Sequence, residues 1–388
     1  MSETRRMVLG LGLMLILGWA AAFAEAGEGD RVVPSPRGTA AKKWRIGYYE
    51  GGQYPDYEVI LKATVKGLVA LGWLRPLDLP PENNATPGGF WGWLVRNASS
   101  DRIEFVADGY YAAGNFDEKL RSRTKATLIK RLSEKRDIDL MIAMGTWAGQ
   151  DLANEDHRTP VVVLSTSDPV GAGIVRSAVD SGLDHLHAKV EPERYARQLE
   201  LFHDIAHFRR LGIVYEDTRE GRTFAAVEAI EKTAVARNFQ VVRCHAPFRD
   251  IPVREAERRV SDCYREIAKT ADAVYVTVHR GVTSDSLPSI VTALNAAAIP
   301  SFSMLGENEV KQGILMSVAQ GNYSYVGRFH AETIGRIING AKPRSISQVW
   351  LAPAKIALNL KTAEIIGYDP PVDLLLATDE IYQTILGH

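Results

Sequence analysis

The sequence predicts an α/β fold made of two lobes, each with a doubly wound parallel sheet that is covered by helices on both faces. From Trp44 onward, short apolar segments of strand length alternate with amphipathic segments of helix length, and this alternation implies parallel sheets with right-handed crossovers. Most of the predicted strands are apolar throughout, as expected when both faces of a sheet are covered. The alternation runs through two successive series, so two lobes are expected.

Length and composition fit this prediction and exclude several classes of function. A chain of 388 residues is long enough for about two domains. The net charge of −1 argues against a general nucleic-acid binder, which usually carries a strongly basic face. The only cysteines, Cys244 and Cys263, show no metal-ligand spacing, so no metal site is expected. A disulfide between them is possible in an oxidising compartment, and the sequence leaves that question open.

The N-terminal segment, residues 1–26, predicts a signal peptide. Arg5 and Arg6 precede a long run without charges, which ends in small residues suited to cleavage. The run approaches the length of a membrane span, so an uncleaved anchor is the less favoured alternative. We therefore expect an exported protein in the periplasm or another extracytoplasmic space. Residues 27–43, rich in Gly, Pro and polar residues, predict a flexible linker.

The first series begins with a strand at 45–49 and a helix whose apolar face carries Tyr57, Ile60, Leu61, Leu68 and Leu71. The further elements expected in this series are a strand at 103–107, a basic amphipathic helix at 120–135, and strands at 140–144 and 161–164. The segment 76–98 breaks the pattern and is too long for an ordinary connection. It is either an insertion that packs its aromatic residues on its own lobe or a flap over a cleft.

The second series continues the same alternation. Its expected helices lie at 191–207, 223–237, 253–270 and 287–298, and its expected strands at 211–215, 239–243, 273–278 and 299–302. The first of these helices places Tyr195, Leu199, Phe202 and Ala206 on one face, which predicts packing against the second sheet.

Polar side chains gather where the predicted strands end. The buried run Val161–Leu164 stops in Ser165, Thr166 and Asp168, and ligands of open α/β sheets bind at the carboxyl edge of the sheet. Asp168 could instead cap the helix that Asp-Pro often introduces. Gly145 and Thr146 open a predicted helix whose backbone N–H groups suit a carboxylate, although Thr146 could merely be the N-cap.

The other strand ends offer aromatic, acidic and hydroxyl groups in both lobes. His279 is the one candidate for a general base, but no nucleophile or orienting group accompanies it, so a ligand contact or a structural histidine is the preferred interpretation. Together with Trp147, which the resemblance described below adds, the predicted ligand-binding set is Tyr49, Glu50, Tyr54, Gly145, Thr146, Trp147, Ser165, Thr166, Asp168, Tyr215, Glu216, Thr277, His279 and Ser303.

Common catalytic and nucleotide-binding motifs are missing from the sequence. It contains no Gly-x-Ser-x-Gly, no phosphate-binding Gly-x-x-x-x-Gly-Lys, no His-Glu-x-x-His and no strand-linked Gly-x-Gly-x-x-Gly. Hydroxyls, carboxylates and aromatics at the facing edges of two sheets instead predict a cleft for a zwitterionic small molecule. We therefore expect a binding protein without a cofactor, with an enzyme using His279 or Asp168 as a minor alternative.

Five stretches of the chain resemble the ABC-transporter substrate-binding proteins of the tryptophan/tyrosine-binding type, which have the type I periplasmic-binding fold. They are Met-Gly-Thr-Trp-Ala-Gly at 144–149, the Ser-Asp-Pro-Val-Gly-Ala-Gly core within 160–175, and the segments 325–343, 359–367 and 370–380. The resemblance spans the chain from Arg45 to about Tyr382. Trp147 departs from the small residue or Pro that the family usually has after Gly-Thr, and the insertion at 76–98 is a second departure.

The resemblance implies two lobes joined by three hinge strands, with crossings near residues 185, 308 and 345. The expected lobes are 44–185 with 309–345, and 186–308 with 346–388. It also implies a permease and an ATPase, encoded elsewhere, as partners. The expected function is a monomeric exported receptor for a small ligand, first of all an aromatic or aliphatic amino acid. A periplasmic sensor that signals to a membrane protein is the alternative.

Overall fold

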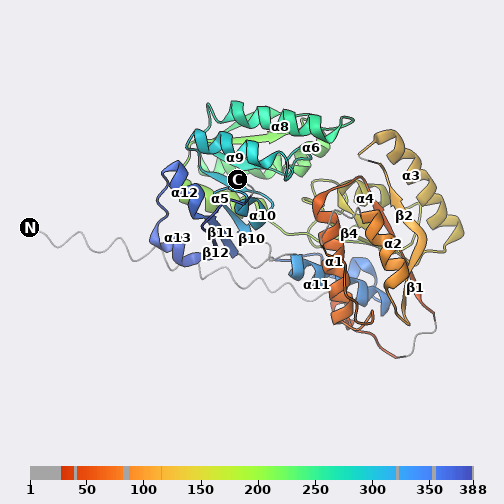
Figure 1. The fold of residues 1–388 in the computed structure, drawn as a ribbon. Helices are drawn as coiled ribbons and strands as arrows, with labels where there is room; N and C mark the ends of the chain where they lie inside the picture. The colour runs from red at the N-terminus through yellow and green to blue at the C-terminus, as the bar shows by residue number, and fades with distance from the viewer. Residues whose placement is uncertain are drawn as a thin grey trace, which may run out of the picture.

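Two separate sheets organise the chain, as the sequence predicts (Figure 1). The computed structural model describes residues 28–38, 42–81, 87–114, 116–319, 323–351 and 355–386. The predicted signal peptide at 1–26 lies outside the described residues. Among the described residues, no helix is both long and apolar enough to cross a bilayer.

The first sheet has five parallel strands in the order β2-β1-β3-β4-β5. Its strands are β1 (Trp44–Glu50), β2 (Ile103–Ala112), β3 (Leu140–Met144), β4 (Val161–Leu164) and β5 (Leu186–Ala188). Its helices are α1 (Pro55–Ala70), α2 (Pro87–Asn97), α3 (Glu118–Lys130), a π-helical turn (Arg131–Lys135), α4 (Gly145–Leu152) and α11 (Ser324–Ile338).

Alternation along the strands of the first sheet divides its core into two halves. Ile46 and Tyr48 face a cluster that includes apolar residues of α1, α2 and α11. Tyr49 and Met141 face the opposite cluster, to which α3 and α4 contribute. Successive side chains of a strand point to opposite faces, so a strand that is apolar throughout serves both clusters.

The second sheet has seven strands in the order β12-β11-β10-β9-β8-β6-β7. Its strands are β6 (Arg210–Tyr215), β7 (Gln240–His245), β8 (Ala273–Val276), β9 (Ser301–Ser303), β10 (Met316–Ala319), β11 (Lys355–Asn359) and β12 (Thr378–Tyr382). The helices of this lobe are α5 (Arg194–Ala206), α6 (Arg219–Phe224), α7 (Val227–Arg237), α8 (Val253–Ile267), α9 (Leu287–Ala296), α10 (Glu307–Lys311), α12 (Leu360–Ile366) and α13 (Val372–Ala377). The pairing of β10 with β11 is antiparallel, and the other strand pairings of this sheet are parallel.

Strand pairing locates the crossings between the lobes and corrects the second of them, which was expected near residue 308. Strand β5 pairs with β4, so the first crossing falls just after Ala188, close to the position expected near residue 185. Strand β10 pairs with β9 of the second sheet, so the chain returns to the first lobe after Ala319 and residues 309–319 belong to the second lobe. At the hinge, Val190 N–H donates to Gln348 O at 2.8 Å, which joins the first crossing to the third.

Two predicted helices also differ from the observed ones. The helix expected at 120–135 is α3 followed by the π-helical turn Arg131–Lys135. The helix expected at 223–237 is divided into α6 and α7 at Ala226, whose positive φ of 50° cannot continue a right-handed helix.

The insertion at 76–98 is part of the first lobe's core as far as it is described. Residues 87–97 form α2, whose Trp91 is buried and contacts Phe105 edge-on with ring centroids 5.3 Å apart. The Trp91 indole also donates to Val106 O at 3.0 Å. The aromatic residues therefore pack on their own lobe, as the first of the two interpretations expects, and α2 is not a flap.

The segment expected to be a flexible linker, 27–43, is instead docked on the first lobe where it is described. The Trp73 indole donates to Pro34 O at 2.6 Å, and the Asn339 amide donates to Val33 O at 2.7 Å. Composition predicted a linker because the segment has no hydrophobic period. It is held mainly through its backbone carbonyls, and such contacts leave no trace in a hydrophobic pattern.

The two cysteines form a disulfide within the second lobe. Cys244 of β7 and Cys263 of α8 are bonded, with their Cα atoms 5.5 Å apart. The bond ties an outer strand of the sheet to the helix that covers it.

Candidate functional site

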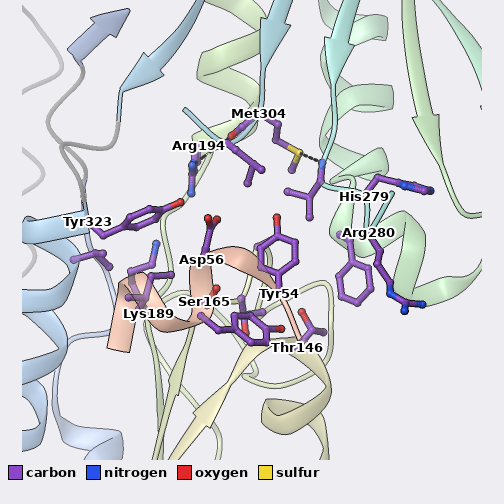
Figure 2. Close-up of a pocket in the computed structure, with 18 of the residues that line it drawn as sticks. Tyr54, Asp56, Thr146, Ser165, Lys189, Arg194, His279, Arg280, Met304 and Tyr323 are labelled. Carbon is purple, nitrogen blue, oxygen red and sulfur yellow. Dashed lines mark hydrogen bonds between the residues drawn. The ribbon is translucent and has the colours of Figure 1, made fainter. Parts of the chain in front are cut away.

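A cavity between the two lobes draws its lining from both of them (Figure 2). It encloses about 910 Å³, open solvent at its mouth included. The first lobe contributes Tyr54, Asp56, Tyr57, Ile60, Phe116, Thr146, Ser165, Thr166 and Ser167. Lys189, Arg194, Tyr195, Phe224, Phe248, Val278, His279, Arg280, Met304, Leu305, Tyr323, Val326 and His330 complete the lining.

Aromatic rings form a large part of the cavity wall. Tyr54 and Tyr57 lie with ring centroids 5.4 Å apart at the start of α1, and Phe248 contacts His279 edge-on in the second lobe at 4.9 Å. Stacking between aromatic faces gives shape selection beyond simple burial of area. The wall therefore suits a ligand with a flat or carbon-rich part.

Five of the predicted site residues line this cavity: Tyr54, Thr146, Ser165, Thr166 and His279. The hydroxyl oxygen of Thr166 is buried and has no hydrogen-bond partner. A buried hydroxyl without a partner costs free energy, so Thr166 is ready to bond a ligand. Ser165 has φ of 58°, an unusual value for a residue with a side chain, and bends the chain at the end of β4.

Gly145 supports the cavity without lining it. Its φ is 84°, and a Cβ atom built there would lie 1.8 Å from the hydroxyl oxygen of Tyr57. Only glycine permits this backbone conformation together with so close an approach. The residue thus places α4 directly behind the Tyr57 ring.

The charged groups of the cavity are residues that the sequence analysis missed. Asp56 lies in the first turn of α1, and burial raises the pKa of its carboxyl, while a hydrogen bond from Tyr323 and the charge of Arg194 oppose the increase. Arg194 opens α5 in the second lobe. The cavity therefore brings a carboxyl and a guanidinium together from opposite lobes.

Lys189 adds a second cation at the hinge. Its ammonium lies 4.7 Å from the centre of the Trp350 ring and 3.7 Å from the carboxylate of Glu191. Burial, with the nearby Arg194 adding repulsion, lowers the pKa of Lys189 to about 8. The weak pairing with Glu191 leaves the ammonium able to attract an anionic group.

His279 does not have the geometry of a general base. Its Nε2 bonds Ala246 O at 2.8 Å, and its Nδ1 accepts from the N–H of Gly281 at 2.9 Å. Burial lowers the pKa of the imidazole to about 4, so the ring is neutral at pH 7. Because both ring nitrogens are occupied, His279 is a structural residue that presents its ring to the cavity.

Asp168 does not line the cavity and closes a turn instead. One carboxylate oxygen accepts from the N–H groups of Val170 at 3.1 Å and Gly171 at 2.8 Å. Neither the ligand contact nor the helix cap expected at Asp168 is seen, because its carboxylate closes a turn and no helix lies between β4 and β5.

Three other predicted residues of the first lobe point into its own interior. The Tyr49 hydroxyl donates to Asp151 at 2.7 Å, and Trp147 contacts Phe116 edge-on. Glu50 accepts from the hydroxyls of Tyr48 and Tyr110. Burial raises the pKa of Glu50 to about 7, and the two hydrogen bonds oppose the increase.

Four predicted residues of the second lobe likewise serve its own structure. Glu216 accepts from the backbone N–H groups of Phe248 and Arg249 at 3.0 and 2.9 Å. Tyr215 contacts His245 through its hydroxyl, at 3.2 Å. Thr277 donates to Val214 O, and Ser303 donates to Glu309. None of the four lines the cavity.

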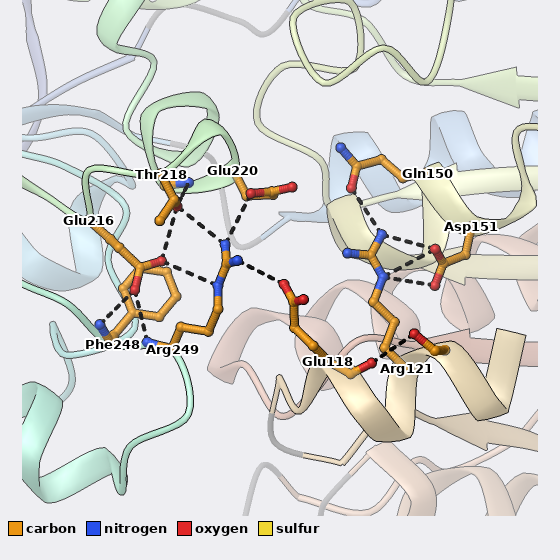
Figure 3. A network of polar contacts seen from close by, with 11 residues as sticks. Glu118, Arg121, Gln150, Asp151, Glu216, Thr218, Glu220, Phe248 and Arg249 are labelled. Carbon is orange, nitrogen blue, oxygen red and sulfur yellow. Dashed lines mark hydrogen bonds and ion pairs between the residues drawn. The ribbon is translucent and has the colours of Figure 1, made fainter.

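An ion pair outside the cavity joins the two lobes (Figure 3). Glu118 at the start of α3 lies 2.8 Å from Nη1 of Arg249, which follows β7. Nη2 of the same guanidinium bonds Glu220 at 3.0 Å and Thr218 at 3.3 Å within the second lobe. Arg249 is thus positioned by its own lobe to receive Glu118 from the other.

The sequence is similar to a known protein family and to a curated protein. The family model for ABC transporter substrate binding proteins matches residues 113–381. The curated tyrosine-binding protein of Clostridioides difficile (strain R20291) is 22% identical over 240 residues, which are 62% of this chain and 65% of that protein. The matched part is thus slightly less than two thirds of that relative's length.

Solved structures share the fold over most of the chain. An ABC domain of Streptococcus pneumonia in complex with L-Trp gives a TM-score of 0.66 at 18% identity, covering 88% of this chain and 100% of that one. A conserved domain protein of Vibrio cholerae gives 0.65 at 19% identity with the same coverage. A ligand-free, open substrate-binding protein with adhesive properties from Clostridium difficile gives 0.57 at 20% identity, covering 88% and 99%.

Proposed function

The chain belongs to the ABC transporter substrate-binding protein family, and from this premise we propose that it is a receptor for a free amino acid. In this proposal the protein works outside the cytoplasm as a monomer. It closes its two lobes around the ligand and hands it chemically unchanged to a permease, whose ATPase drives transport.

The observation that carries the proposal is that Asp56 and Arg194 line one cavity from opposite lobes. An amino acid is a zwitterion, and its two charged groups need partners of opposite sign when they leave water. Asp56 can accept from the ammonium, while Arg194 and Lys189 can receive the carboxylate, with the free hydroxyl of Thr166 as a further bond. Figure 2 shows Asp56, Arg194 and Tyr323 close together on one side of the cavity.

The aromatic wall supports an amino acid with a large side chain. Tyr54, Tyr57 and Phe248 offer flat apolar surface beyond the charged groups. Two of the similar proteins have names that point the same way, one as a tyrosine-binding protein and one in complex with L-Trp. The disulfide between Cys244 and Cys263 supports a location outside the reducing cytoplasm.

Closure by a hinge explains why the charges come from both lobes. A ligand shifts an open–closed equilibrium only by its differential affinity for the two forms. In the open form the ligand meets only one lobe, and closure adds the second set of contacts. Both ring nitrogens of His279 are hydrogen-bonded, so this imidazole is not placed to act as a base on the ligand.

A thermal-shift screen against the common L-amino acids tests the proposal. A ligand at one hundred times its Kd stabilises a protein by about 2.7 kcal/mol, which raises Tm by several degrees. Absence of any shift at millimolar concentrations across the panel would contradict the assignment.

Variants then test the site itself. We expect D56N and R194Q to weaken binding at least about tenfold, because hydrogen bonds to charged groups are worth roughly 1.5–3 kcal/mol. D168N and R237Q are matched controls, since Asp168 caps a turn, Arg237 pairs with Asp204, and neither Asp168 nor Arg237 lines the cavity. Equal losses in the controls would contradict the assigned roles.

A further inference from the structure

Arg280 is a buried cation of the cavity whose hydrogen bonds are incomplete. It follows β8 in the second lobe and is only 8% exposed. Its Nη1 donates to Phe248 O at 2.9 Å and Ile251 O at 3.1 Å. Its Nε and Nη2 are buried and have no hydrogen-bond partner. The guanidinium is therefore held in place by one nitrogen while the other two are unused.

The two unused nitrogens form the edge of a guanidinium that receives a carboxylate side-on. The same edge is used elsewhere in this chain. Nε and Nη2 of Arg45 hold Asp139, and Nε and Nη2 of Arg131 hold Asp137. Such two-point contacts between a planar guanidinium and a carboxylate are specific in geometry as well as strong.

Among the residues that the structure describes, no carboxylate fills this role at Arg280. The carboxylates whose charges act on the guanidinium are Asp250 and Glu216, and neither bonds its Nε or Nη2. Glu216 already accepts from two backbone N–H groups and from the Thr218 hydroxyl. Burial lowers the pKa of the Arg280 guanidinium. Leaving a buried charged donor unsatisfied is costly, so a partner from outside the chain would be strongly favoured.

Arg280 lies away from the charged groups assigned to the amino-acid backbone of the ligand. Figure 2 places Arg194 and Asp56 on one side of Tyr54 and Arg280 on the other. The ring of Phe116, from the first lobe, lies 5.8 Å from the Arg280 guanidinium. Closure therefore covers Arg280 with an aromatic face, and the space between the two ends is bounded by aromatic rings.

Resting on the proposed function, we propose that the ligand is an amino acid whose side chain ends in a second carboxylate, which the free edge of Arg280 binds. Arg194 and Asp56 receive the α-carboxylate and α-ammonium, and the aromatic wall receives the carbon skeleton between the two ends. Arg280 is then the residue that distinguishes an acidic side chain from its uncharged counterpart.

Calorimetry with isosteric pairs tests this inference on the full mature chain. The pairs are L-glutamate with L-glutamine, and 4-carboxy-L-phenylalanine with 4-carbamoyl-L-phenylalanine. We expect at least one acid to bind ten or more times more tightly than its amide. The preference should disappear in R280Q and return in part in R280K, because a lysine restores the charge but not the two-point contact. R243Q, which removes a cation that pairs with Glu231 outside the cavity, should leave the preference unchanged.

The possible results separate this inference from the proposed function. If neutral amino acids bind and no acid is preferred, or if R280Q weakens acid and amide equally, the role of Arg280 is wrong and the amino-acid receptor stands. If no amino acid binds, the proposed function is wrong, and glutarate and terephthalate are compared with their monoamides. A preference for the diacids that R280Q abolishes would preserve the role of Arg280, and absence of that preference would overturn it. R280K, with folding checked by circular dichroism, keeps the test valid should R280Q fail to fold.

Discussion

The ion pair between Glu118 and Arg249 should hold the closed form of the protein, so we expect E118Q to weaken ligand binding. Arg249 keeps its contacts with Glu220 and Thr218 whether the lobes are open or closed, because all three belong to the second lobe. Glu118 comes from the first lobe and reaches Arg249 only when the lobes approach. Removing its charge therefore destabilises the closed form selectively.

The exposure of the two side chains sets the size of the effect. Glu118 is 51% exposed and Arg249 is 23% exposed, so solvent screens the pair. Ion pairs of this kind contribute about 0.2–1 kcal/mol. The anchored Arg249 places this one in the upper half of the range, at about 0.6–1 kcal/mol. In the proposed mechanism, in which binding requires closure, that loss corresponds to a rise in Kd of about three- to fivefold.

Calorimetry and stopped-flow fluorescence, with the amino acid identified in the thermal-shift screen, measure the effect. We expect the rise in Kd to reside in a faster koff, and to shrink at high salt as screening weakens the wild-type pair. E231Q is the matched control, since Glu231 pairs with Arg243 at 3.0 Å within one lobe and does not contact Arg249. An unchanged Kd in E118Q, or an equal change in E231Q, would refute the reasoning.

Three further predictions concern stability. The pKa of Glu50 is raised from 4.5 to about 7 in the folded protein. Its contribution to the stability of the fold is therefore fully present below about pH 4.5 and is lost as the pH rises through 7. In urea unfolding, the free energy of unfolding of E50Q should therefore rise relative to that of the wild type by up to about 3 kcal/mol between pH 5 and pH 8. If the free energies of unfolding of the two proteins changed in parallel with pH, the prediction would be contradicted. G145A should lose about 2 kcal/mol or more and bind poorly, whereas G367A, which also has positive φ but no atom within 4 Å, should lose only about 1 kcal/mol. Reducing the Cys244–Cys263 bond, which spans a sequence separation of 19, should cost about 3 kcal/mol in unfolding experiments and lower Tm, and an unchanged Tm in reductant would refute that estimate.

The fold was predictable because hydrophobic periodicity reports directly on which faces of an element are buried. The apolar strands Leu140–Met144 and Val161–Leu164 were expected at the residues where they lie. The crossings between lobes were less predictable, because a short strand such as Met316–Ala319 carries no information about which sheet it joins. The sheet that such a strand joins is decided by the strands it pairs with in the folded protein.

The site was predictable only where the rule about strand ends applies to its residues. Thr146, Ser165 and Thr166 follow strands and line the cavity. Glu50 and Glu216 also stand at strand ends, but their carboxylates bond groups within their own lobes, and the sequence gives no direction for a side chain.

The charged groups that were missed come from other positions. Asp56 lies in the first turn of a helix, Arg194 opens another helix, and Lys189 lies on a hinge segment. One usable signal was the Tyr-Pro-Asp run at 54–56, because a proline just inside a helix places the following acidic residue at the N-terminal end.

The docked segment at residues 28–38 has a practical consequence for recombinant work. A chain trimmed to begin at the first strand, near Trp44, would remove the acceptors of the Trp73 indole and the Asn339 amide. Both donors would then have to find water at the base of the first lobe. Fusion partners and affinity tags are therefore best joined upstream of Glu28, where they leave these hydrogen bonds intact.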